Sequence, residues 1–471
     1  MKRTKIVCTI GPATAKPAVM EKLVRAGMNV ARLNMSHGSL AAHAKLIRNL
    51  RLAAEKTGEP LALLLDLQGP KIRVGDLPKQ GLKLRAGEEV VFTTLAAAKG
   101  KILVTHKTLH KDVKKGDQIL LDDGLLEVKV ESVRGKDIKA KVIVGGVLAS
   151  HKGMNFPGAT LSVSALSAKD RRDVRFGVKQ GVDFVALSFV RSARDIHLLR
   201  RLLSKGARAK ISPIMIIAKI EKHEALKNFD EILRAADGVM VARGDLGVET
   251  PAAEVPLRQK TMIQKCLAAG KPVIVATQML DSMIRNPRPT RAEVSDVANA
   301  IIDHADAVML SGETATGSYP VDAVMTQATI AREVEASIFD DLHFHAEEGA
   351  LLEPEEAIGE SAGLLARVTA AKAIVGSSLS GETARQIARF RPEIPVYIAT
   401  PGERVMRQMN LSWGVRPFLI KQAKNLVSLK KSIYSALLQA KALKRGDRVI
   451  YISGAPGKEG ESNQVTLETV Q

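Results

Sequence analysis

The stretches Ile217-Ala218-Lys219-Ile220-Glu221 and Val241-Ala242-Arg243-Gly244-Asp245 decide the fold, because each closes an apolar, strand-like run with charged residues. Parallel α/β sheets and barrels present groups to a ligand at the carboxyl ends of their strands. If the two runs lie near each other in one barrel, Glu221 and Asp245 can hold a hard divalent cation while Lys219 faces the same anion. This trio suits phosphate or enolate chemistry.

Apolar strand-like runs alternate with amphipathic helical stretches along most of the chain. Two helical spacers, Pro17–Ala26 and Leu257–Ala269, are each followed by a glycine, as helix C-termini often are. Open doubly wound sheets give a similar pattern, but the regular alternation favours a closed (β/α)8 TIM barrel. The eight expected strands are Lys5–Ile10, Asn29–Leu33, Leu61–Asp66, Val182–Leu187, Ile214–Lys219, Gly238–Ala242, Pro272–Ala276 and Ala307–Leu310.

Residues 70–166 separate the third run from the fourth and are too long for a helical spacer. The alternating stretch Leu125–Val130 and the turn signals at Gly116-Asp117 and Asp123-Gly124 predict a small antiparallel β domain. Because this domain would leave the barrel at the face where strands end, we expect it to act as a lid.

After about residue 340 the alternation restarts and predicts a smaller α/β domain. A helix is expected to end near Ala371, and strands are expected at Ala373–Gly376, Val396–Ala399 and Asp447–Ile452. The expected α/β architecture therefore has three domains: a TIM-barrel catalytic domain of residues 1–69 and 167–340, an inserted β-barrel lid domain of residues 70–166, and a C-terminal α/β domain of residues 341–471.

The chain of 471 residues carries a formal net charge of +20, which raises the question of a nucleic-acid partner. The basic residues are spread along the chain, and aromatic residues make up only 3% of it, so few side chains can stack on bases. We expect an attraction for small polyanions and no nucleic acid as the main partner.

Cysteine usage and hydropathy indicate the cellular compartment expected for this chain. Cys8 and Cys266 are far apart in apolar segments, so we expect no disulfide and a cytoplasmic location. Neither a signal peptide nor an apolar run long enough to cross a bilayer is apparent, and no membrane partner is expected.

Polar side chains follow the expected strands and should converge on one mouth of the barrel. A single charged residue after a strand is most often part of a solvated loop or a helix cap, but the joint arrangement at eight strand ends outweighs that interpretation. A mouth with two arginines, a lysine and several carboxylates suits a phosphorylated acid bound with metal help better than a nucleophilic hydrolysis. These residues are Arg32, Asn34, Ser36, His37, Asp66, Ser188, Lys219, Glu221, Arg243, Asp245, Thr277, Ser311 and Glu313.

Seven motifs, in order, resemble those of the pyruvate kinase family over essentially the whole chain. The resemblance implies transfer of a phosphoryl group from phosphoenolpyruvate to ADP, giving ATP and enolpyruvate, which is then protonated to pyruvate. It also implies a homotetramer. The motifs are Thr4–Pro12, Arg32–Gly38, Ala218–Glu221, Met240–Gly247, Ala276–Leu280, Pro289–Asn299 and Met309–Thr314.

The resemblance also implies roles for single residues at the mouth. Glu221 and Asp245 would ligate Mg²⁺, or Mn²⁺, which bridges the substrate's carboxylate, enol oxygen and phosphate. Lys219 would stabilise the phosphoryl group in flight and the enolate after it, and Arg32 would clamp the phosphate. Thr277, with bound water, is the candidate for delivering the proton to C3.

The remaining implied contacts are with the substrate carboxylate and the nucleotide. Backbone amides at Arg243, Gly244 and Asp245 would receive the carboxylate, as helix N-termini do for anions. Ser311 and Glu313 complete the expected substrate-binding set, and the expected nucleotide-binding residues are Asn34, His37, Arg73 and Lys152.

The chain departs from the commonest family pattern after Asp66, where Leu67, Gln68 and Lys71 stand in place of Thr, Lys and Glu. The resemblance links that common pattern with K⁺ dependence. A fixed ammonium from Lys71 would supply the charge of K⁺, and two cations there would repel each other. Activity without K⁺ is therefore expected, as in a bacterial-type, K⁺-independent subgroup with this lysine, although the monovalent-site ligands Asn34, Ser36, Asp66 and the Leu67 carbonyl are retained.

The segment 378–383 resembles the family's effector phosphate loop and precedes a helix expected at Ala384–Phe390. Hydroxyls and amides at a helix N-terminus bind phosphate, so Ser378, Ser380, Gly381 and Thr383 are the candidate contacts. Glu382 stands where a basic residue is common, which weakens an anionic effector. A sugar phosphate and a nucleoside monophosphate are both open as the effector.

Two rival interpretations remain at this stage. One is another metal-dependent barrel enzyme acting on pyruvate or phosphoenolpyruvate, such as an aldolase or a lyase, which would need neither residues 34–37 nor the inserted domain. The other is a non-catalytic RNA-associated protein, which would retain RNA in a strongly salt-dependent way.

Overall fold

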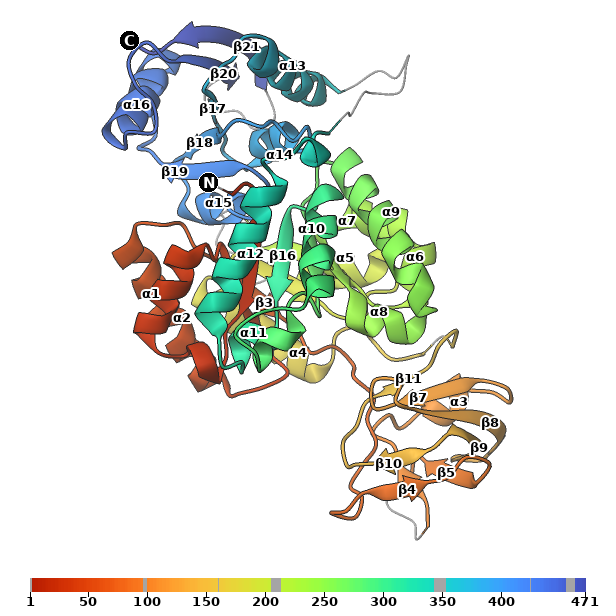
Figure 1. Ribbon diagram of the computed structural model, residues 1–471. Coiled ribbons are helices and arrows are strands. Elements are labelled where there is room, and N and C mark those ends of the chain that lie inside the picture. Colours follow the sequence, from red (N-terminus) through yellow and green to blue (C-terminus); the bar gives the residue numbers. More distant parts are fainter. Residues whose placement is uncertain are drawn as a thin grey trace.

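The computed structural model describes residues 2–95, 100–159, 161–204, 213–342, 353–423, 425–454 and 462–471. Eight parallel strands close into a barrel in the order β1-β16-β15-β14-β13-β12-β3-β2, so the expected barrel is confirmed. Figure 1 shows the inserted segment and the C-terminal segment at opposite ends of this barrel. The strands are β1 (Lys5–Thr9), β2 (Val30–Asn34), β3 (Ala62–Asp66), β12 (Phe184–Leu187), β13 (Met215–Ile220), β14 (Gly238–Ala242), β15 (Val273–Ala276) and β16 (Ala307–Leu310).

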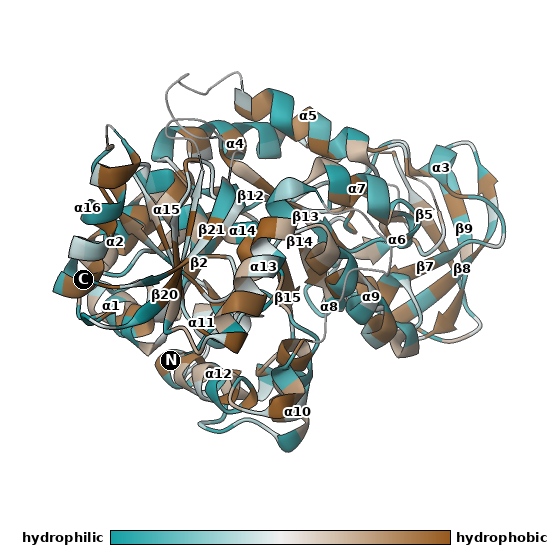
Figure 2. Ribbon diagram, turned by 90° about the horizontal axis from the view of Figure 1, so that it is seen from above, coloured by the Kyte–Doolittle hydropathy of each residue, from teal (hydrophilic) through white to brown (hydrophobic). Residues whose placement is uncertain are grey.

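Helices cover the outside of the barrel, and Figure 2 shows hydrophobic and hydrophilic residues alternating along them, as amphipathic helices require. These helices are α1 (Pro17–Ala26), α2 (Leu40–Thr57), α4 (Ala168–Gln180), α5 (Ala193–Ser204), α7 (Phe229–Ala235), α9 (Val255–Ala268), α10 (Arg291–Ile302) and α12 (Pro320–Val334). Short helices stand in the loops: α6 (His223–Lys227), α8 (Arg243–Glu249), α11 (Gly312–Ala315) and the 3₁₀ turns Pro12–Thr14, Ala252–Glu254, Asp281–Ile284 and Ile338–Asp340.

Helix α10 begins at a capping box. The hydroxyl of Thr290 accepts from the backbone N–H of Glu293 at 3.2 Å, and Oε2 of Glu293 accepts from the backbone N–H of Thr290 at 2.7 Å. These two bonds satisfy amides that a helix start leaves open. The helix is thereby held where it presents Asp296 to the mouth of the barrel.

Two apolar layers hold the barrel together. Alternate strand residues such as Val239 and Val241 pack outward against the helices, while Met240 between them belongs to the cluster that fills the interior. Leu411 of the C-terminal segment belongs to the same interior cluster and is 1% exposed. The interior is therefore a packed core that the C-terminal segment closes at one end.

The inserted segment contains two sheets over its own apolar cluster, which includes Phe92, Ile119 and Val128. One sheet pairs β10 with β4, and the other has the order β11-β7-β8-β9-β5-β6, antiparallel except between β5 and β6. The elements are β4 (Leu82–Leu84), β5 (Glu89–Thr93), β6 (Ile102–Leu103), α3 (Leu109–Asp112), β7 (Gln118–Leu121), β8 (Leu126–Arg134), β9 (Asp137–Val144), β10 (Gly146–Leu148) and β11 (Met154–Asn155).

The C-terminal segment has a five-stranded sheet in the order β19-β18-β17-β20-β21, in which only β21 runs antiparallel to its neighbour. Its first helix ends at Val368, three residues before the expected end near Ala371. The elements are α13 (Pro354–Val368), β17 (Ala373–Ser377), α14 (Glu382–Ala388), β18 (Val396–Thr400), α15 (Glu403–Met409), β19 (Val415–Leu419), α16 (Leu426–Gln439), β20 (Arg448–Gly454) and β21 (Ser462–Thr469).

Within the described ranges, no helix combines the length and the apolar character needed to span a bilayer.

Candidate active site

Four polar side chains form one layer inside the barrel, just below its mouth. Along each strand every second residue faces inward, so Thr9, Arg32, Asp66 and Lys219 follow the interior residues Val7, Val30, Leu64 and Ile217. Nε of Arg32 donates to Asp66 Oδ2 at 2.7 Å, and its Nη1 donates to the hydroxyl of Thr9 at 2.8 Å. The side chain of Arg32 is thereby fixed from two strands.

Lys219 is the centre of this layer. Its ammonium lies 2.7 Å from Glu221 Oε1 and 3.3 Å from Asp66 Oδ1, and it donates to the Ser188 hydroxyl at 2.8 Å. Burial disfavours the ammonium, but Asp66 and Glu221 outweigh burial and raise the pKa of Lys219 above its usual value. Lys219 is therefore a fixed cation at physiological pH rather than a group that exchanges protons.

Asp66 is the counterpart of these cations. Burial favours its neutral acid, but Lys219 and then Arg32 outweigh burial and hold the pKa of Asp66 below its ordinary value. A carboxylate paired with two cations in a 1% exposed position stays ionised and keeps both cations in place.

Glu221 and Asp245 are the pair expected to hold a divalent cation. Glu221 is 1% exposed, and its Oε2 accepts from the backbone N–H of Phe189 at 2.7 Å. Burial raises the pKa of Glu221 despite the opposing effect of the Lys219 ammonium, and the nearby carboxylate of Asp245 adds to the rise. A buried carboxylate with a second carboxylate nearby fits a site that a cation neutralises.

The donor set suits Mg²⁺. No cluster of three or more His, Cys, Asp or Glu side chains able to hold a metal ion occurs among the residues that the structure describes. Mg²⁺ is usually bound by one or two carboxylates, with waters and substrate oxygens as its other ligands, so the pair Glu221 and Asp245 meets that requirement.

Helix α8 begins at the mouth directly after β14. The backbone N–H of Gly244 in its first turn donates to the hydroxyl of Thr277 at 2.8 Å, and that hydroxyl donates to the Ala276 carbonyl at 2.6 Å. Thr277 has φ = 72°, a left-handed conformation that is rare for a β-branched residue. The strained turn after β15 thus aims the Thr277 hydroxyl at the amides of α8.

The guanidinium of Arg243 points away from this helix start. Its Nη1 pairs with Asp296 Oδ1 at 2.6 Å, and its Nη2 donates to the Thr277 carbonyl at 2.7 Å. The side chain therefore braces the turn at Thr277, while the backbone of Arg243 belongs to the start of α8.

Ser311 and Glu313 lie after β16. Glu313 Oε2 accepts from the Ser311 N–H at 2.7 Å, and its Oε1 accepts from the Leu280 N–H at 3.0 Å. Burial raises the pKa of Glu313. This carboxyl ties the loop after β16 to the loop after β15, and both oxygens are used for backbone contacts.

The expected monovalent-site residues surround β2 and β3. Asn34 Oδ1 accepts from the Ser36 N–H at 3.0 Å, and the Leu67 carbonyl accepts from the Ser188 hydroxyl at 2.7 Å. Lys71 is placed elsewhere, with its ammonium 4.0 Å from Asp123 in the inserted segment.

The expected nucleotide-binding residues fall into two places. Asn34 ends β2 and His37 lies in the loop after it, where the His37 N–H donates to the Asn34 carbonyl at 3.3 Å. Arg73 donates to the His151 carbonyl at 2.7 Å, and Lys152 pairs with Asp122 at 2.8 Å, both beside the inserted segment. A cleft of about 1040 Å³ opens between that segment and the barrel, lined by Lys71, Asp123, Asp245, Asp296 and neighbouring residues.

The candidate effector residues are in the C-terminal segment, apart from the barrel mouth. The Gly381 N–H donates to the Ser378 hydroxyl at 2.9 Å, and the Glu382 N–H donates to the Ser380 hydroxyl at 3.3 Å. Glu382 pairs with Arg385, so its charge is already compensated within α14. Helix α14 begins at Glu382, two residues before the expected start, and so follows the loop directly.

Two residues of the mouth were missing from the expected set. Thr9, which accepts from Arg32, could have been found from the inward alternation of β1. Asp296 lies on α10, and no local signal in the sequence indicates that this helix reaches Arg243.

Comparison with known proteins gives consistent matches. A family model described as "Pyruvate kinase, barrel domain" matches residues 1–324, and one described as "Pyruvate kinase, alpha/beta domain" matches residues 356–467. The whole chain is 45% identical to a pyruvate kinase of Geobacillus stearothermophilus, of which it covers 80%. It is also 43% identical over its whole length to pyruvate kinase 2 of Synechocystis, covering 80% of that protein, and to a pyruvate kinase of Staphylococcus aureus, covering 81%.

Proposed function

The chain belongs to the pyruvate kinase family, and on that premise we propose that it transfers the phosphoryl group of phosphoenolpyruvate to ADP in a Mg²⁺-dependent reaction that does not require K⁺. It is an enzyme of the transferase class. The observation that carries the proposal is the buried layer of Arg32, Asp66, Lys219 and Glu221 at the barrel mouth, with Asp245 beside it.

Charge neutralisation is the main demand of phosphoryl transfer. Arg32 binds the phosphate through its free guanidinium edge, and the ammonium of Lys219 faces the moving phosphoryl group. Mg²⁺ held by Glu221 and Asp245 would supply further neutralisation of the charge on the phosphate and the enol oxygen. Lys219 stays charged, as the Arg32 guanidinium does, because the pKa of Lys219 is raised.

The substrate carboxylate is bound by the amides that begin α8, including the Gly244 N–H. That amide is now bonded to the Thr277 hydroxyl at 2.8 Å, so the incoming carboxylate takes the place of the hydroxyl. The released hydroxyl then turns toward the substrate, where with bound water it delivers the proton to C3 and completes pyruvate. Ser311 and Glu313 hold the loops around this site.

ADP is expected between the barrel and the inserted domain. Asn34 and His37 contact it from the barrel, and Arg73 and Lys152 contact it from the insert, which acts as a lid. The insert is residues 70–166, between barrel portions 1–69 and 167–340, with residues 341–471 as the C-terminal domain. Assembly as a homotetramer is part of the proposal.

The direct test measures pyruvate formation from phosphoenolpyruvate and ADP with Mg²⁺, in a K⁺-free buffer and with K⁺ added. We expect rapid, ADP-dependent turnover in both buffers. A Lys219→Met variant should lose about 10³-fold or more in kcat, because a fixed cation at the reacting phosphate is removed. The control Lys56→Met removes an exposed ammonium paired with Glu21 on the outer helices and should keep full activity.

Independence from K⁺ has a local electrostatic reason. Asp66, a ligand of the expected monovalent site, is already paired with Arg32 and Lys219, and we propose that the ammonium of Lys71, which lies 4.0 Å from Asp123 in this structure, takes the place of K⁺ at that site. A Lys71→Met variant should therefore become stimulated by K⁺. Many-fold stimulation of the unaltered enzyme by K⁺ at saturating substrates would contradict this part of the proposal.

The C-terminal loop is proposed to bind the phosphate of an activating sugar phosphate or nucleoside monophosphate through Ser378, Ser380, Gly381 and Thr383. Support comes from the loop's position directly before α14. The double variant Ser380→Ala, Thr383→Ala should lose activation while keeping basal activity. If neither compound class changes the rate of the unaltered enzyme, the loop has no effector role.

A further inference from the structure

Three side chains connect the barrel with the inserted segment at a buried point. Nδ2 of Asn155, on β11, donates to Glu249 Oε1 at 3.2 Å, and the same oxygen is ion-paired with the ammonium of Lys222. Asn155 and Glu249 are each 6% exposed, so water does not compete freely for these bonds. None of the three belongs to the expected substrate, metal or nucleotide set.

The barrel side of this contact is part of the catalytic framework. Glu249 ends the short helix α8, whose first turn carries Gly244 and Asp245, and Lys222 follows the carboxylate Glu221 directly in the chain. The Lys222 ammonium also lies 5.6 Å from the centre of the Phe189 ring, and the backbone N–H of Phe189 donates to Glu221. A group bound to Glu249 and Lys222 is thus held in a fixed position relative to Glu221 and to α8.

The insert side of the contact is a two-stranded ribbon. The two chain connections between barrel and insert run antiparallel, with Arg73 opposite Gly153. The Met154 N–H donates to the Ile72 carbonyl at 2.9 Å, and the Val74 N–H donates to the Lys152 carbonyl at 3.0 Å. Arg73 and Lys152, the expected nucleotide contacts of the insert, both belong to this ribbon. Lys152 precedes Asn155 by three residues, and Arg73 lies opposite Gly153 on the other connection.

We propose that Asn155, Glu249 and Lys222 are positioning residues that dock this ribbon on α8. They thereby hold Arg73 and Lys152 at the distance from Glu221 and Asp245 at which a bound ADP can contact both sides. The inference rests on the proposed function, because it assigns the lid side of the nucleotide site. The contact orders groups that meet ADP. It does not touch the interior layer of Arg32, Asp66 and Lys219 that binds phosphoenolpyruvate.

Because Glu249 is a carboxylate, the residue at position 155 must be a hydrogen-bond donor for this contact to form. An amide N–H on a buried carboxylate is stronger than a neutral hydrogen bond, whereas a second carboxylate in its place would repel Glu249. Asn155→Asp should therefore undock the ribbon, while Lys222 keeps Glu249 paired and α8 intact. The double variant Asn155→Asp, Glu249→Gln exchanges donor and acceptor, since the new amide can donate to the new carboxylate.

The test compares the full-length enzyme with these variants in two measurements. Steady-state rates at saturating phosphoenolpyruvate give kcat and KM for ADP, and calorimetry with Mg²⁺ and no nucleotide gives the dissociation constant of phosphoenolpyruvate. Asn155→Asp should raise KM for ADP about tenfold or more, as the loss of a charge-assisted bond predicts, and leave the phosphoenolpyruvate constant within about twofold. The double variant should recover most of the lost ADP affinity.

The matched control is Asp137→Asn, which breaks the Lys101 ion pair of 2.5 Å inside the insert and should leave both constants unchanged. The inference is overturned if Asn155→Asp leaves KM for ADP unchanged, if phosphoenolpyruvate affinity falls in parallel, or if the double variant is no better than the single one. Failure of the proposed function is a different result, because then the unaltered enzyme forms no pyruvate from phosphoenolpyruvate and ADP.

Discussion

Asp66 is the residue on which the charge balance at the mouth depends. Its two oxygens face different cations, Arg32 at 2.7 Å and Lys219 at 3.3 Å, in a position that is 1% exposed. Burying a carboxylate costs desolvation free energy, and the attraction to its two cations offsets that cost only while both cations stay in place. The arrangement therefore couples the orientation of the Arg32 and Lys219 side chains to the folding of the barrel.

Asp66→Asn should destabilise the protein by about 3 kcal/mol at pH 7, because it leaves two buried cations short of a partner. The folded-state pKa of Asp66 lies below 3.8, so its stabilising contribution is present above that pH and is lost as pH falls through the folded-state pKa. Urea unfolding at pH 7 and at acid pH measures the difference, which should shrink on acidification. Glu88→Gln, in an exposed pair with Arg85, is the control and should change stability by less than about 0.5 kcal/mol. Equal stability of Asp66→Asn and the unaltered protein at pH 7 would contradict the assignment.

At the scale of elements, the barrel strands could be predicted because buried parallel strands are short, apolar and regularly spaced. Each of the eight expected runs overlaps one barrel strand, and Pro17–Ala26 is the helix α1 residue for residue. Two strands of the C-terminal sheet escaped prediction. β19 contains Pro417, which is tolerated because this strand lies at the sheet edge, and β21 is the antiparallel strand at the other edge.

The contacts of the candidate site could be predicted from the sequence less completely than the strands. Inward alternation along β2, β3 and β13 brings Arg32, Asp66 and Lys219 together, and this follows from the period of a strand. The partners supplied by other elements do not follow from any local period. Asp296 reaches Arg243 from α10, and Asn155 reaches Glu249 from the insert, so both contacts depend on how whole elements pack.

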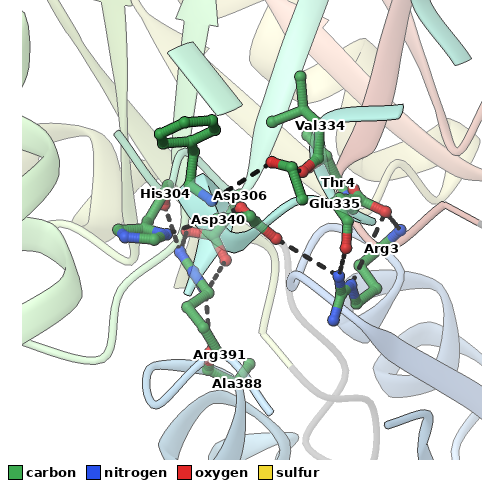
Figure 3. Close-up of polar contacts among 11 residues, drawn as sticks. Arg3, Thr4, His304, Asp306, Val334, Glu335, Asp340, Ala388 and Arg391 are labelled. Atoms are coloured by element: carbon green, nitrogen blue, oxygen red, sulfur yellow. Dashed lines mark hydrogen bonds and ion pairs between the residues drawn. The ribbon is translucent and has the colours of Figure 1, made fainter. Parts of the chain in front are cut away.

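At the scale of the whole molecule, the two ends of the barrel meet different parts of the chain. The mouth faces the inserted domain, and the opposite end is closed by the C-terminal segment (Figure 1). There Arg391 donates to Asp306 at 3.1 Å and to the His304 carbonyl at 2.6 Å, while Arg3 pairs with Asp340 at 3.5 Å (Figure 3). This buried contact joins the residues before β1, the 3₁₀ turn after α12, the residues before β16 and the C-terminal segment.

The contact contains two titratable groups, His304 and Asp340, whose pKa values are shifted in opposite directions. Nδ1 of His304 lies 3.8 Å from Asp340 Oδ1. Burial, and then the nearby Arg391, lower the pKa of His304 to about 4. Burial outweighs Arg3 and raises the pKa of Asp340 to about 7, and Glu335 adds to that rise. Between these values the folded state resists a proton on the histidine and retains one on the aspartate.

The sign of each effect follows from proton binding. From pH 4 to 6.5 the unfolded chain binds more protons at His304, so this group makes stability rise with pH. From pH 3.8 to 7 the folded chain binds more protons at Asp340, so that group makes stability fall with pH. The two effects partly cancel in the unaltered protein.

Removing one group should expose the other. Asp340→Asn should make the free energy of unfolding rise between pH 4.5 and 6.5, and His304→Asn should make it fall, each by about 1 to 3 kcal/mol. The only tryptophan, Trp413, reports the transition, because its ring lies 5.0 Å from the Arg3 guanidinium and 5.3 Å from that of Arg391. Urea unfolding followed by its fluorescence at several pH values gives the slopes. Parallel pH profiles for both variants and the unaltered protein would mean that the two groups titrate alike in the folded and unfolded states, and that this contact joins the domains without sensing pH.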